Sequence, residues 1–589
     1  MSKNIIILGA GYGGIEAAKK LNKVLKKNPE TTITLINNHP FHTLLTELHE
    51  VAGNRIDSKG VMISLDELFD STKVNVVVDY IKDIDFDNKV LKSDEFEYKY
   101  DYLILGTGSE PTHCGVEGVI ENSFTLWSLE DAEEINDHIQ DCFRKARVSE
   151  DAKLRKELLS FAVCGGGFTG VEILGELIEW FDELAKKYEI PRNEVDLYLC
   201  EGLDHILPNI DNKLADRAMN YLKKNGVTIK LGSFVDEVRE NGLTLANGEE
   251  IASRTIIWNC GVRASDTAAS LELAADRAGR IKVNEYLQSV SHPEVYAIGD
   301  NAATPWDGDD KILPALVEAA LQTGDTAAVN IAADIKGTKK EKITPKFHGI
   351  MVSIGRKFGV ADVMGLSLKG WPAILMKHMV NWHYLFGIGG VKNGCTYILD
   401  YIDEESSNKG FVPNLFAHFS QKSFSFWIAF LRIFLGVQWL LSGLDKVKNG
   451  WLIWGDKLVA GASTSPIGPN PVGWYVDFMK AVVFEYPLLF QWMITLGELA
   501  LATSLILGIL IPLGAIGSVF MTLNFFLSGF YPQNATLPWW LMASITSIGS
   551  GRALSLDYYL MPWLKKLIWG SRKGKNEDLK KIMKPIVKE

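Results

Sequence analysis

Two patterns of hydrophobic residues divide the chain into unlike parts. Up to about residue 415, short apolar runs alternate with stretches of mixed polarity, and charges occur throughout. From Phe424 to about Gly549, Leu, Phe, Trp and Ile dominate and charged residues are scarce. The first pattern is typical of an α/β domain with parallel strands, and the second is typical of helices that cross a membrane.

The chain opens with a strand, a glycine-rich loop and a helix. Asn4–Leu8 is a short apolar, β-branched run, the loop reads Gly9-Ala10-Gly11-Tyr12-Gly13-Gly14, and a helical pattern continues to about Lys27. In such a GxGxxG loop the first glycine permits the tight turn, the second lets the backbone approach a pyrophosphate, and the third lets the helix lie close to the strand. In this context the loop predicts a dinucleotide site rather than a bare turn.

The same device occurs a second time. Ser160–Val163 is the predicted strand, the loop Gly165–Gly170 follows, and a helix continues to about Lys187. We therefore predict a second dinucleotide site.

The two loops differ in the residue that follows the next strand. An acid there holds a ribose hydroxyl, and Glu201, after Val195–Leu199, fits this role and favours NADH over NADPH. A solvated carboxylate at a strand end is the plainer interpretation of Glu201. After Ile33–Ile36 the acid is replaced by Asn37, so the first loop does not indicate which dinucleotide it binds.

Two dinucleotide loops indicate that electrons pass between a tightly held flavin and a visiting nicotinamide. Tyr102–Pro111 is an apolar strand that ends in a Gly-Thr-Gly turn, which suits the passage from one dinucleotide domain to the next. Val295–Ala302 contains Gly299-Asp300, whose carboxylate is placed to accept a hydrogen bond from a flavin ribityl hydroxyl.

Composition excludes several other classes of protein. The net charge is −11, which argues against nucleic-acid binding. The six cysteines are scattered and form no CxxC, so we expect no metal site and no disulfide framework. The start runs directly into a predicted strand, so we expect no signal peptide and a soluble part that stays in the cytoplasm.

Several motifs resemble, in the same order, those of the type II NADH dehydrogenases. They are GAGYGGIEAA, TELHEVAG (Thr46–Gly53), the GTGS turn, GGGFTGVEILGEL (Gly165–Leu177), IIWNCGVR (Ile256–Arg263), AIGD and HYLFGIGG (His383–Gly390). The resemblance covers about residues 3–400. It implies a single-chain flavoprotein that contains FAD, oxidises NADH and reduces a membrane quinone on the cytoplasmic face, without pumping protons.

The resemblance also implies two nested Rossmann-type domains. We expect an FAD-binding domain in 1–115 and 286–345, an NADH-binding domain in 116–285 and a membrane-associating region in 346–410. An all-α transmembrane domain of four helices in 424–565 and a basic cytoplasmic tail in 566–589 complete the predicted organisation.

The resemblance assigns roles to individual residues. The implied FAD contacts are Gly9, Ala10, Gly11, Tyr12, Gly13, Gly14, Asn37, Asn38, Ile81, Gly108, Asp300, Val317, Glu318 and Lys377. The implied NADH contacts are Gly165, Gly167, Gly170 and Glu201. Glu172, in the family's FTGxE run, is expected near the flavin as the catalytic residue that assists charge or proton movement. A first-turn carboxylate favoured by the helix dipole is the plainer interpretation.

One departure from the family concerns the quinone. The family's AQxxxQ segment falls on Val317–Gln322, where Gln322 is kept and the first glutamine is Glu318. An acid at that place is able to deliver a proton to a reduced quinone, or to pair with a cation such as Lys377. We expect both Glu318 and Gln322 at the quinone site.

Other acceptors fit less well. Flavin disulfide reductases need a pair of cysteines near the first loop, and residues 28–60 contain none. Sulfide:quinone oxidoreductases use cysteines near the flavin, whereas Cys164 and Cys260 lie at predicted strand ends and suit small buried hydrophobes. An enzyme that oxidises a sulfur compound, and a flavoprotein that only senses NADH, stay as alternatives.

The second half supports a membrane acceptor. Trp371–Trp382 suits a helix on a membrane surface or an ordinary amphipathic helix. Four apolar segments predict membrane spans: Phe424–Leu444, Leu488–Leu507, Leu510–Phe530 and Leu537–Gly549. With the NADH site in the cytoplasm, four spans return the basic tail to the same side and place Asp445–Pro487 outside.

Residues of about 424–565 resemble the DoxX-like membrane proteins, some of which belong to thiosulfate:quinone oxidoreductases. Arg432 and Glu498 fall inside predicted spans, where we expect them to pair with each other or to serve a quinone or proton path. The resemblance suggests a menaquinone-type acceptor and a role in extracellular electron transfer, and it allows a homodimer.

Overall fold

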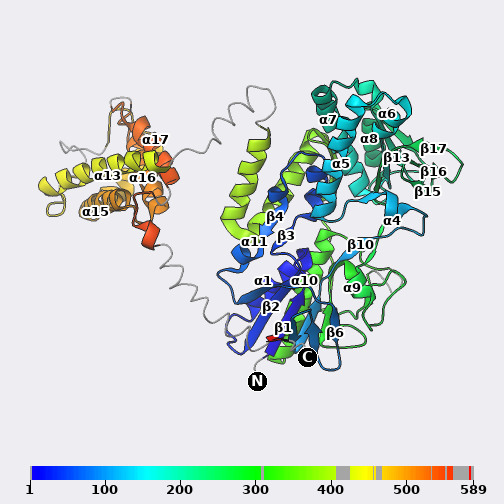
Figure 1. Cartoon of the computed structure of the whole chain (residues 1–589). Helices are drawn as coiled ribbons and strands as arrows, with labels where there is room; N and C mark the ends of the chain where they lie inside the picture. Colours follow the sequence, from blue (N-terminus) through cyan, green and yellow to red (C-terminus); the bar gives the residue numbers. More distant parts are fainter. Residues whose placement is uncertain are drawn as a thin grey trace. The chain divides into compact units, whose positions relative to one another are not determined.

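The computed structural model describes residues 3–306, 311–405, 425–455, 457–458, 467–531, 534–550, 553–560 and 583–585. The chain forms two compact units, Met1–Ser420 with Arg572–Glu589, and Gln421–Ser571 (Figure 1). Each unit is described by itself below.

The first unit is built on a parallel sheet in the order β5 (Val74–Val78), β2 (Thr31–Asn37), β1 (Lys3–Leu8), β9 (Tyr102–Leu105) and β21 (Val295–Ala297). Helix α1 (Tyr12–Val24) follows β1 and packs against α10 (Val317–Lys336). A Cβ atom on Gly324 would collide with the carbonyl oxygen of Gly13, so glycine at this position lets the two helices approach.

A second parallel sheet has the order β14 (Val227–Lys230), β13 (Asp196–Cys200), β12 (Ser160–Cys164), β18 (Thr255–Trp258) and β11 (Phe124–Thr125). Its helices include α5 (Leu129–Val148), α7 (Phe168–Tyr188) and α8 (Asn212–Lys224). All of its strands lie in sequence between β9 and β21 of the first sheet. This confirms the nested arrangement of two Rossmann-type folds, while the expected domain boundaries stay predictions.

Smaller sheets complete the first unit. The antiparallel strands β15 (Val235–Arg239), β16 (Gly242–Leu245) and β17 (Glu250–Ala252) form one of them. In another, β6 (Asp83–Asp85), β7 (Val90–Lys92) and β8 (Phe96–Lys99) are joined by β26 (Met583–Pro585), which pairs with β8. The rest of the expected tail, 566–582 and 586–589, lies outside the described residues.

The region after α10 folds back onto the nested domain. Strands β23 (Gly349–Ile354), β24 (Phe358–Val363) and β25 (Leu366–Lys369) form an antiparallel sheet whose first strand packs against α7. Gly175 of α7 leaves room for this contact, because a Cβ atom there would collide with the backbone of Ile354 and Gly355. The α11 helix (Trp371–Glu405) follows and bends at Gly390, whose φ is 67° and ψ is −157°. It includes the helix expected at Trp371–Trp382.

The second unit is helical. It contains α13 (Ser425–Lys448), α14 (Gly473–Phe478) continued by a π-helical turn at Met479–Val483, α15 (Pro487–Leu507), α16 (Ile511–Leu527) and α17 (Leu537–Ser547). Four of these helices coincide with the four apolar segments of the sequence. In the described part of the chain two helices, Trp427–Lys448 and Pro487–Leu507, are long and apolar enough to cross a membrane, while α16 has 17 residues and α17 has 11.

The charged residues inside this bundle do not pair as the sequence suggested. Glu498 is fully buried and accepts both of its hydrogen bonds, each 2.8 Å, from the ammonium of Lys446. Arg432 donates instead to the backbone carbonyls of Leu505, Ala553 and Leu554 and to the hydroxyl of Ser550. The expected Arg432–Glu498 pair is therefore wrong, because the two side chains lie at different levels of the antiparallel helices α13 and α15.

Candidate functional site

The first glycine loop has the shape of a dinucleotide cradle. Gly9 has φ +102°, and a Cβ atom on Gly9 or on Gly14 would collide with backbone atoms. No atom lies within 4 Å of the place where a Cβ on Gly11 would stand. The backbone at Gly11 is thus open to a ligand at the N-terminus of α1, which fits the pyrophosphate of a dinucleotide.

The second loop repeats this geometry. Gly165 has φ +101°, the space beside Gly167 is empty, and a Cβ atom on Gly170 would collide with the carbonyl oxygen of Gly165. Each loop is also tied to the residue after the following strand. Glu201 accepts from the N–H of Gly166 at 2.5 Å, and Asn37 accepts from the N–H of Ala10 at 2.9 Å.

The other residues expected around the flavin follow neighbouring strands. Gly108 comes after β9 with φ +74° and open space beside it, and Asp300 comes after β21. Asp300 accepts a hydrogen bond of 2.7 Å from the hydroxyl of Ser109, and burial raises the pKa of its carboxyl. Ile81 is buried and Asn38 is exposed. The carboxyl ends of β1, β9 and β21 thus bring Gly11, Gly108 and Asp300 to one edge of the sheet.

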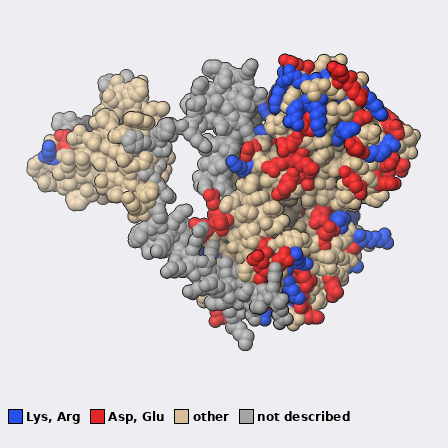
Figure 2. Space-filling view, in the orientation of Figure 1, with Lys and Arg blue, Asp and Glu red and all other residues tan. Residues whose placement is uncertain are grey.

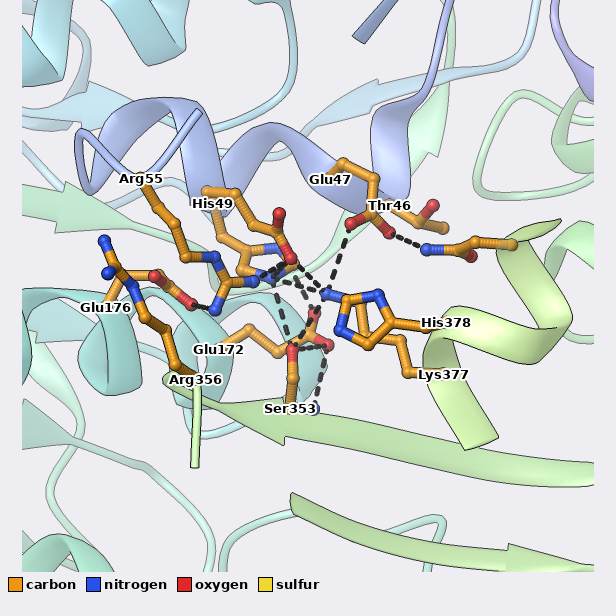
Figure 3. Close-up of polar contacts among 12 residues, drawn as sticks. Thr46, Glu47, His49, Arg55, Glu172, Glu176, Ser353, Arg356, Lys377 and His378 are labelled. Atoms are coloured by element: carbon orange, nitrogen blue, oxygen red, sulfur yellow. Dashed lines mark hydrogen bonds and ion pairs between the residues drawn. The ribbon is translucent and has the colours of Figure 1, made fainter. Parts of the chain in front are cut away.

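Lys377 of α11 lies at the centre of a buried polar cluster (Figure 3). Its ammonium is 2.6 Å from a carboxylate oxygen of Glu50 and 3.3 Å from one of Glu47. It also lies 3.1 Å from the hydroxyl of Ser353 and 3.3 Å from Nε2 of His49. The sequence offered Glu318 as its partner, and this is wrong, because Glu47 and Glu50 neutralise Lys377 instead.

Glu172 of α7 reaches the same cluster from the nested domain. Its Oε1 accepts hydrogen bonds of 3.3 Å from both the amide and the hydroxyl of Ser353 on β23. Burial raises the pKa of the Glu172 carboxyl to about 7, although the charge of Lys377 opposes this shift. A carboxyl with this pKa exchanges its proton at neutral pH, which suits a general acid or base.

Neighbouring charges complete the cluster. His49 stays neutral, because burial and the charges of Lys377 and Arg55 lower its pKa well below the usual value. Arg55 bonds Glu50 and lies 3.0 Å from Glu176 of α7. His49 and Glu50 lie in the motif TELHEVAG, but nothing in that motif assigned either residue a role.

The cluster extends to the second half of α11. Asn381 donates a hydrogen bond of 2.7 Å to Glu47 and lies 3.3 Å from the hydroxyl of Tyr397. That hydroxyl is 2.8 Å from Nδ1 of His378. Polar contacts therefore connect Glu172, through Ser353, Lys377 and Glu47, with Asn381 and Tyr397, which lie on either side of the bend of α11.

The residues expected at the quinone site lie in the first turns of α10, which begins at Val317. Both carboxylate oxygens of Glu318 contact His348, one at its amide and one at its ring, each at 3.0 Å. The amide of Gln322 exchanges two hydrogen bonds of 2.8 Å with the backbone of Lys346. Both side chains hold the segment before β23, and their roles toward a quinone stay predictions.

Comparisons with known proteins identify the family. Residues 3–324 match the family model of the pyridine nucleotide-disulphide oxidoreductases, and residues 427–529 match that of DoxX. Type II NADH:quinone oxidoreductases of Staphylococcus aureus strains NCTC 8325 / PS 47 and MSSA476 are each 30% identical over 392 residues, which span 66% of this chain and 96% of the relative. The chain belongs to the type II NADH:quinone oxidoreductases.

Solved structures agree with the fold of this family. NDH2 from Plasmodium falciparum in complex with NADH superposes with a TM-score of 0.62 at 18% identity, over 68% of this chain and 98% of that one. The sulfide:quinone oxidoreductase of Aquifex aeolicus gives 0.55 at 18% identity, over 67% and 92%. As a type II NADH:quinone oxidoreductase, the chain uses FAD and NADH, as the sequence predicts. It also carries a DoxX domain, which lies outside the part of the chain that matches these relatives.

Proposed function

We propose that this type II NADH:quinone oxidoreductase passes two electrons from NADH, through FAD, to a menaquinone-type quinone without moving protons across the membrane. In the balanced reaction NADH, one proton and the quinone give NAD⁺ and the quinol. The observation that carries the proposal is the pair of open glycine cradles in one nested fold, with the buried Glu172–Lys377 cluster joining the two domains.

The two cradles have separate tasks. The loop Gly9–Gly14, with Gly108 and Asp300, holds FAD, which supplies the two-electron chemistry when bound. The loop Gly165–Gly170 binds the pyrophosphate of NADH, and Glu201 favours NADH because its charge repels a 2′-phosphate.

Glu172 acts as the proton donor in the proposed reaction. Its carboxyl, with a pKa of about 7, releases a proton toward the quinone oxygen that is being reduced. It regains a proton through the hydroxyl of Ser353. The ammonium of Lys377 lies between Glu47 and Glu50 and stabilises negative charge that develops nearby. Glu318 and Gln322 contact the quinone at the start of α10.

The membrane part supports a lipid-soluble acceptor. On the face shown in Figure 2, the second unit presents mostly uncharged side chains, whereas acidic and basic side chains are spread over the first unit. On the first half of α11 the exposed apolar side chains recur at three- and four-residue intervals, as on a helix that lies on a bilayer. They are Trp371, Leu375, Met379, Trp382 and Phe386, with Val380 beside Met379.

The chain connections support an even number of membrane crossings. The chain enters the second unit after Ser420 and leaves it before Arg572. The residues before and after the second unit both belong to the first unit, where β26 pairs with β8. We propose four crossings by α13, α15, α16 and α17, with the dehydrogenase unit on the cytoplasmic face. A protease-protection assay on sealed vesicles tests this orientation.

The sulfur-oxidising alternative is disfavoured by the state of the thiols. Cys164 is fully buried, and its hydrogen bond with Cys200 together with burial raises its pKa well above the usual value. Burial also raises the pKa of Cys260, to about 12. Neither thiol forms the thiolate that a sulfur relay needs. On our proposal the double variant Cys164→Ala/Cys260→Ala keeps its quinone-reducing activity. On the alternative, in which a sulfur compound is the electron donor, the double variant loses it.

Steady-state oxidation of NADH by the purified full chain tests the proposed function. We expect turnover with menaquinone-like acceptors, less with ubiquinone-like acceptors, and little with NADPH as donor. We further propose that the quinol feeds extracellular electron transfer. Slower reduction of an insoluble ferric oxide by cells that lack this chain, restored by its re-expression, tests that step. The family resemblance also allows a homodimer, and mass photometry of the purified chain tests whether one forms.

A further inference from the structure

Each glycine cradle fixes the peptide groups of its second residue from both sides. In the NADH loop, the N–H of Gly166 donates to Glu201, and its carbonyl accepts from the N–H of Leu207 at 2.8 Å. In the FAD loop, the N–H of Ala10 donates to Asn37, and its carbonyl lies 2.8 Å from Nδ1 of His42. The two cradles therefore share one design, but the group that holds the carbonyl differs.

This difference connects only the FAD loop to a distant helix. Leu207 holds the NADH loop with its own backbone, so that bond stays within the nested domain. His42 has a second ring nitrogen, and its Nε2 lies 2.9 Å from the hydroxyl of Tyr384 on α11, 342 residues away in sequence. Tyr384 and Ala10 are thus joined through a single imidazole ring.

The directions of these hydrogen bonds follow from the atoms involved. A carbonyl oxygen only accepts, so Nδ1 of His42 carries the proton and donates to Ala10. His42 is 1% exposed, and burial lowers its pKa to about 4, so the ring is neutral and Nε2 is an acceptor. The hydroxyl of Tyr384 must then donate to His42.

Ring packing makes the connection rigid. Tyr12, at the start of α1, contacts the His42 ring edge-on and the Tyr384 ring at a tilt, each with 5.0 Å between ring centroids. One turn further along α11, the carbonyl of Gly387 accepts from Lys19 of α1. The first half of α11 is therefore fastened to the same helix whose N-terminus faces the open backbone of Gly11.

We propose that Tyr384 and His42 are positioning residues for the flavin, which transmit the position of α11 to the carbonyl of Ala10. The affinity of the chain for FAD then depends on how α11 is seated, while its affinity for the nicotinamide does not. This inference rests on the proposed assignment of the first loop to FAD.

The test measures cofactor affinity without turnover. The full chain is purified in detergent and stripped of flavin, and FAD binding is followed by the quenching of flavin fluorescence. Tyr384→Phe keeps the ring and removes only the donor, so we expect FAD affinity to fall about threefold to tenfold. NAD⁺ affinity, measured by calorimetry, stays at the wild-type value. Tyr475→Phe in the second unit is the control, because its hydroxyl donates to Asn524 and not to His42, and we expect unchanged FAD affinity.

A second variant tests the route through His42. The side-chain amide of Asn in His42→Asn is able to donate to Ala10 but does not reach Tyr384. We expect His42→Asn to weaken FAD binding by itself, and Tyr384→Phe to add less than about twofold in the His42→Asn background, because the two residues act in one chain.

The outcomes separate this inference from the proposed function. A wild-type chain that binds no FAD overturns the proposed function and this inference with it. Wild-type binding together with unchanged affinity in Tyr384→Phe, or full additivity of the two substitutions, overturns this inference alone.

Discussion

Glu172 of the nested domain accepts a hydrogen bond of 3.3 Å from the hydroxyl of Ser353, which lies on a strand packed against that domain from outside. The carboxyl is buried, and its pKa is raised from 4.5 to about 7. It therefore changes protonation in the range where the enzyme works, and this leads to the first two predictions.

Quinone reduction should fall as the pH rises through about 7, because the protonated fraction of Glu172 falls there. Glu172→Gln removes this titration. We expect a turnover number at least tenfold lower that no longer changes near pH 7, while anaerobic reduction of the flavin by NADH changes less. Stopped-flow measurements of the two half-reactions check this. A wild-type pH profile that persists in Glu172→Gln would assign the titration to another group.

The same pKa predicts a pH-dependent stability. Between about 4.5 and about 7 the folded state binds more protons at Glu172 than the unfolded state, so the stability falls as the pH rises through this range. The full effect is about 3 kcal/mol above pH 7. Glu172→Gln should therefore raise the melting temperature more at alkaline than at acidic pH. Glu183→Gln, an exposed position on the same helix, is the control, and an equal effect of both variants would contradict the prediction.

Removing Lys377 should leave the buried carboxylate of Glu47 without its cation, while Glu50 keeps Arg55. We expect Lys377→Met to destabilise the first unit by about 3–5 kcal/mol, because Glu47 is left as a buried charge without its cation. The pKa of Glu172 should also rise, since Lys377 lowers it in the wild type. Lys377→Met combined with Glu47→Gln should recover part of the stability in denaturant titrations, because this variant removes the uncompensated charge. No recovery would mean that Lys377 acts through packing rather than charge.

Glu201 should carry the preference for NADH. Glu201→Ala removes the acceptor for the amides of Gly166 and Leu203 and the charge that repels a 2′-phosphate. We expect the KM for NADH to rise about tenfold and the ratio of NADH to NADPH activity to fall. FAD content should not change, because the first loop is held by Asn37. Loss of FAD together with NADH preference would point to general unfolding.

Lys446 and Glu498 should stabilise the helical bundle and leave the flavin chemistry alone. A double-mutant cycle with Lys446→Met and Glu498→Gln should give a coupling energy of about 1–2 kcal/mol, measured by unfolding in detergent. NADH oxidation with a water-soluble quinone should stay at the wild-type rate. Zero coupling would show that the pair does not hold α13 and α15 together.

The sequence predicted those parts of the site that depend on neighbouring residues. A strand, a GxGxxG loop and a helix form one local unit, so both cradles and the residues after the next strands, Asn37 and Glu201, were found from spacing alone. The nested order of the sheets followed from the family resemblance. Four helices of the second unit, α13, α15, α16 and α17, followed from the apolar segments, because a sustained apolar run of this length predicts a helix in apolar surroundings.

The side-chain partners could not be predicted, because they depend on packing between distant elements. Arg432 and Glu498 looked complementary as the charged pair of two spans, but the register of α13 against α15 brings Lys446 to Glu498. Glu318 meets His348 because α10 packs beside the segment before β23. No sequence pattern marked His42, because its two partners are distant along the chain: Ala10 is 32 residues away and Tyr384 is 342 residues away.

The most direct test of the account is a sequential mixing experiment on the purified full chain without oxygen. Mixing with stoichiometric NADH should bleach the visible absorbance of bound flavin, and a second mixing with a menaquinone analogue should restore it while quinol forms. Flavin that stays oxidised in the presence of NADH, or reduced flavin that the quinone does not reoxidise, would contradict the transfer of electrons from nicotinamide through flavin to quinone.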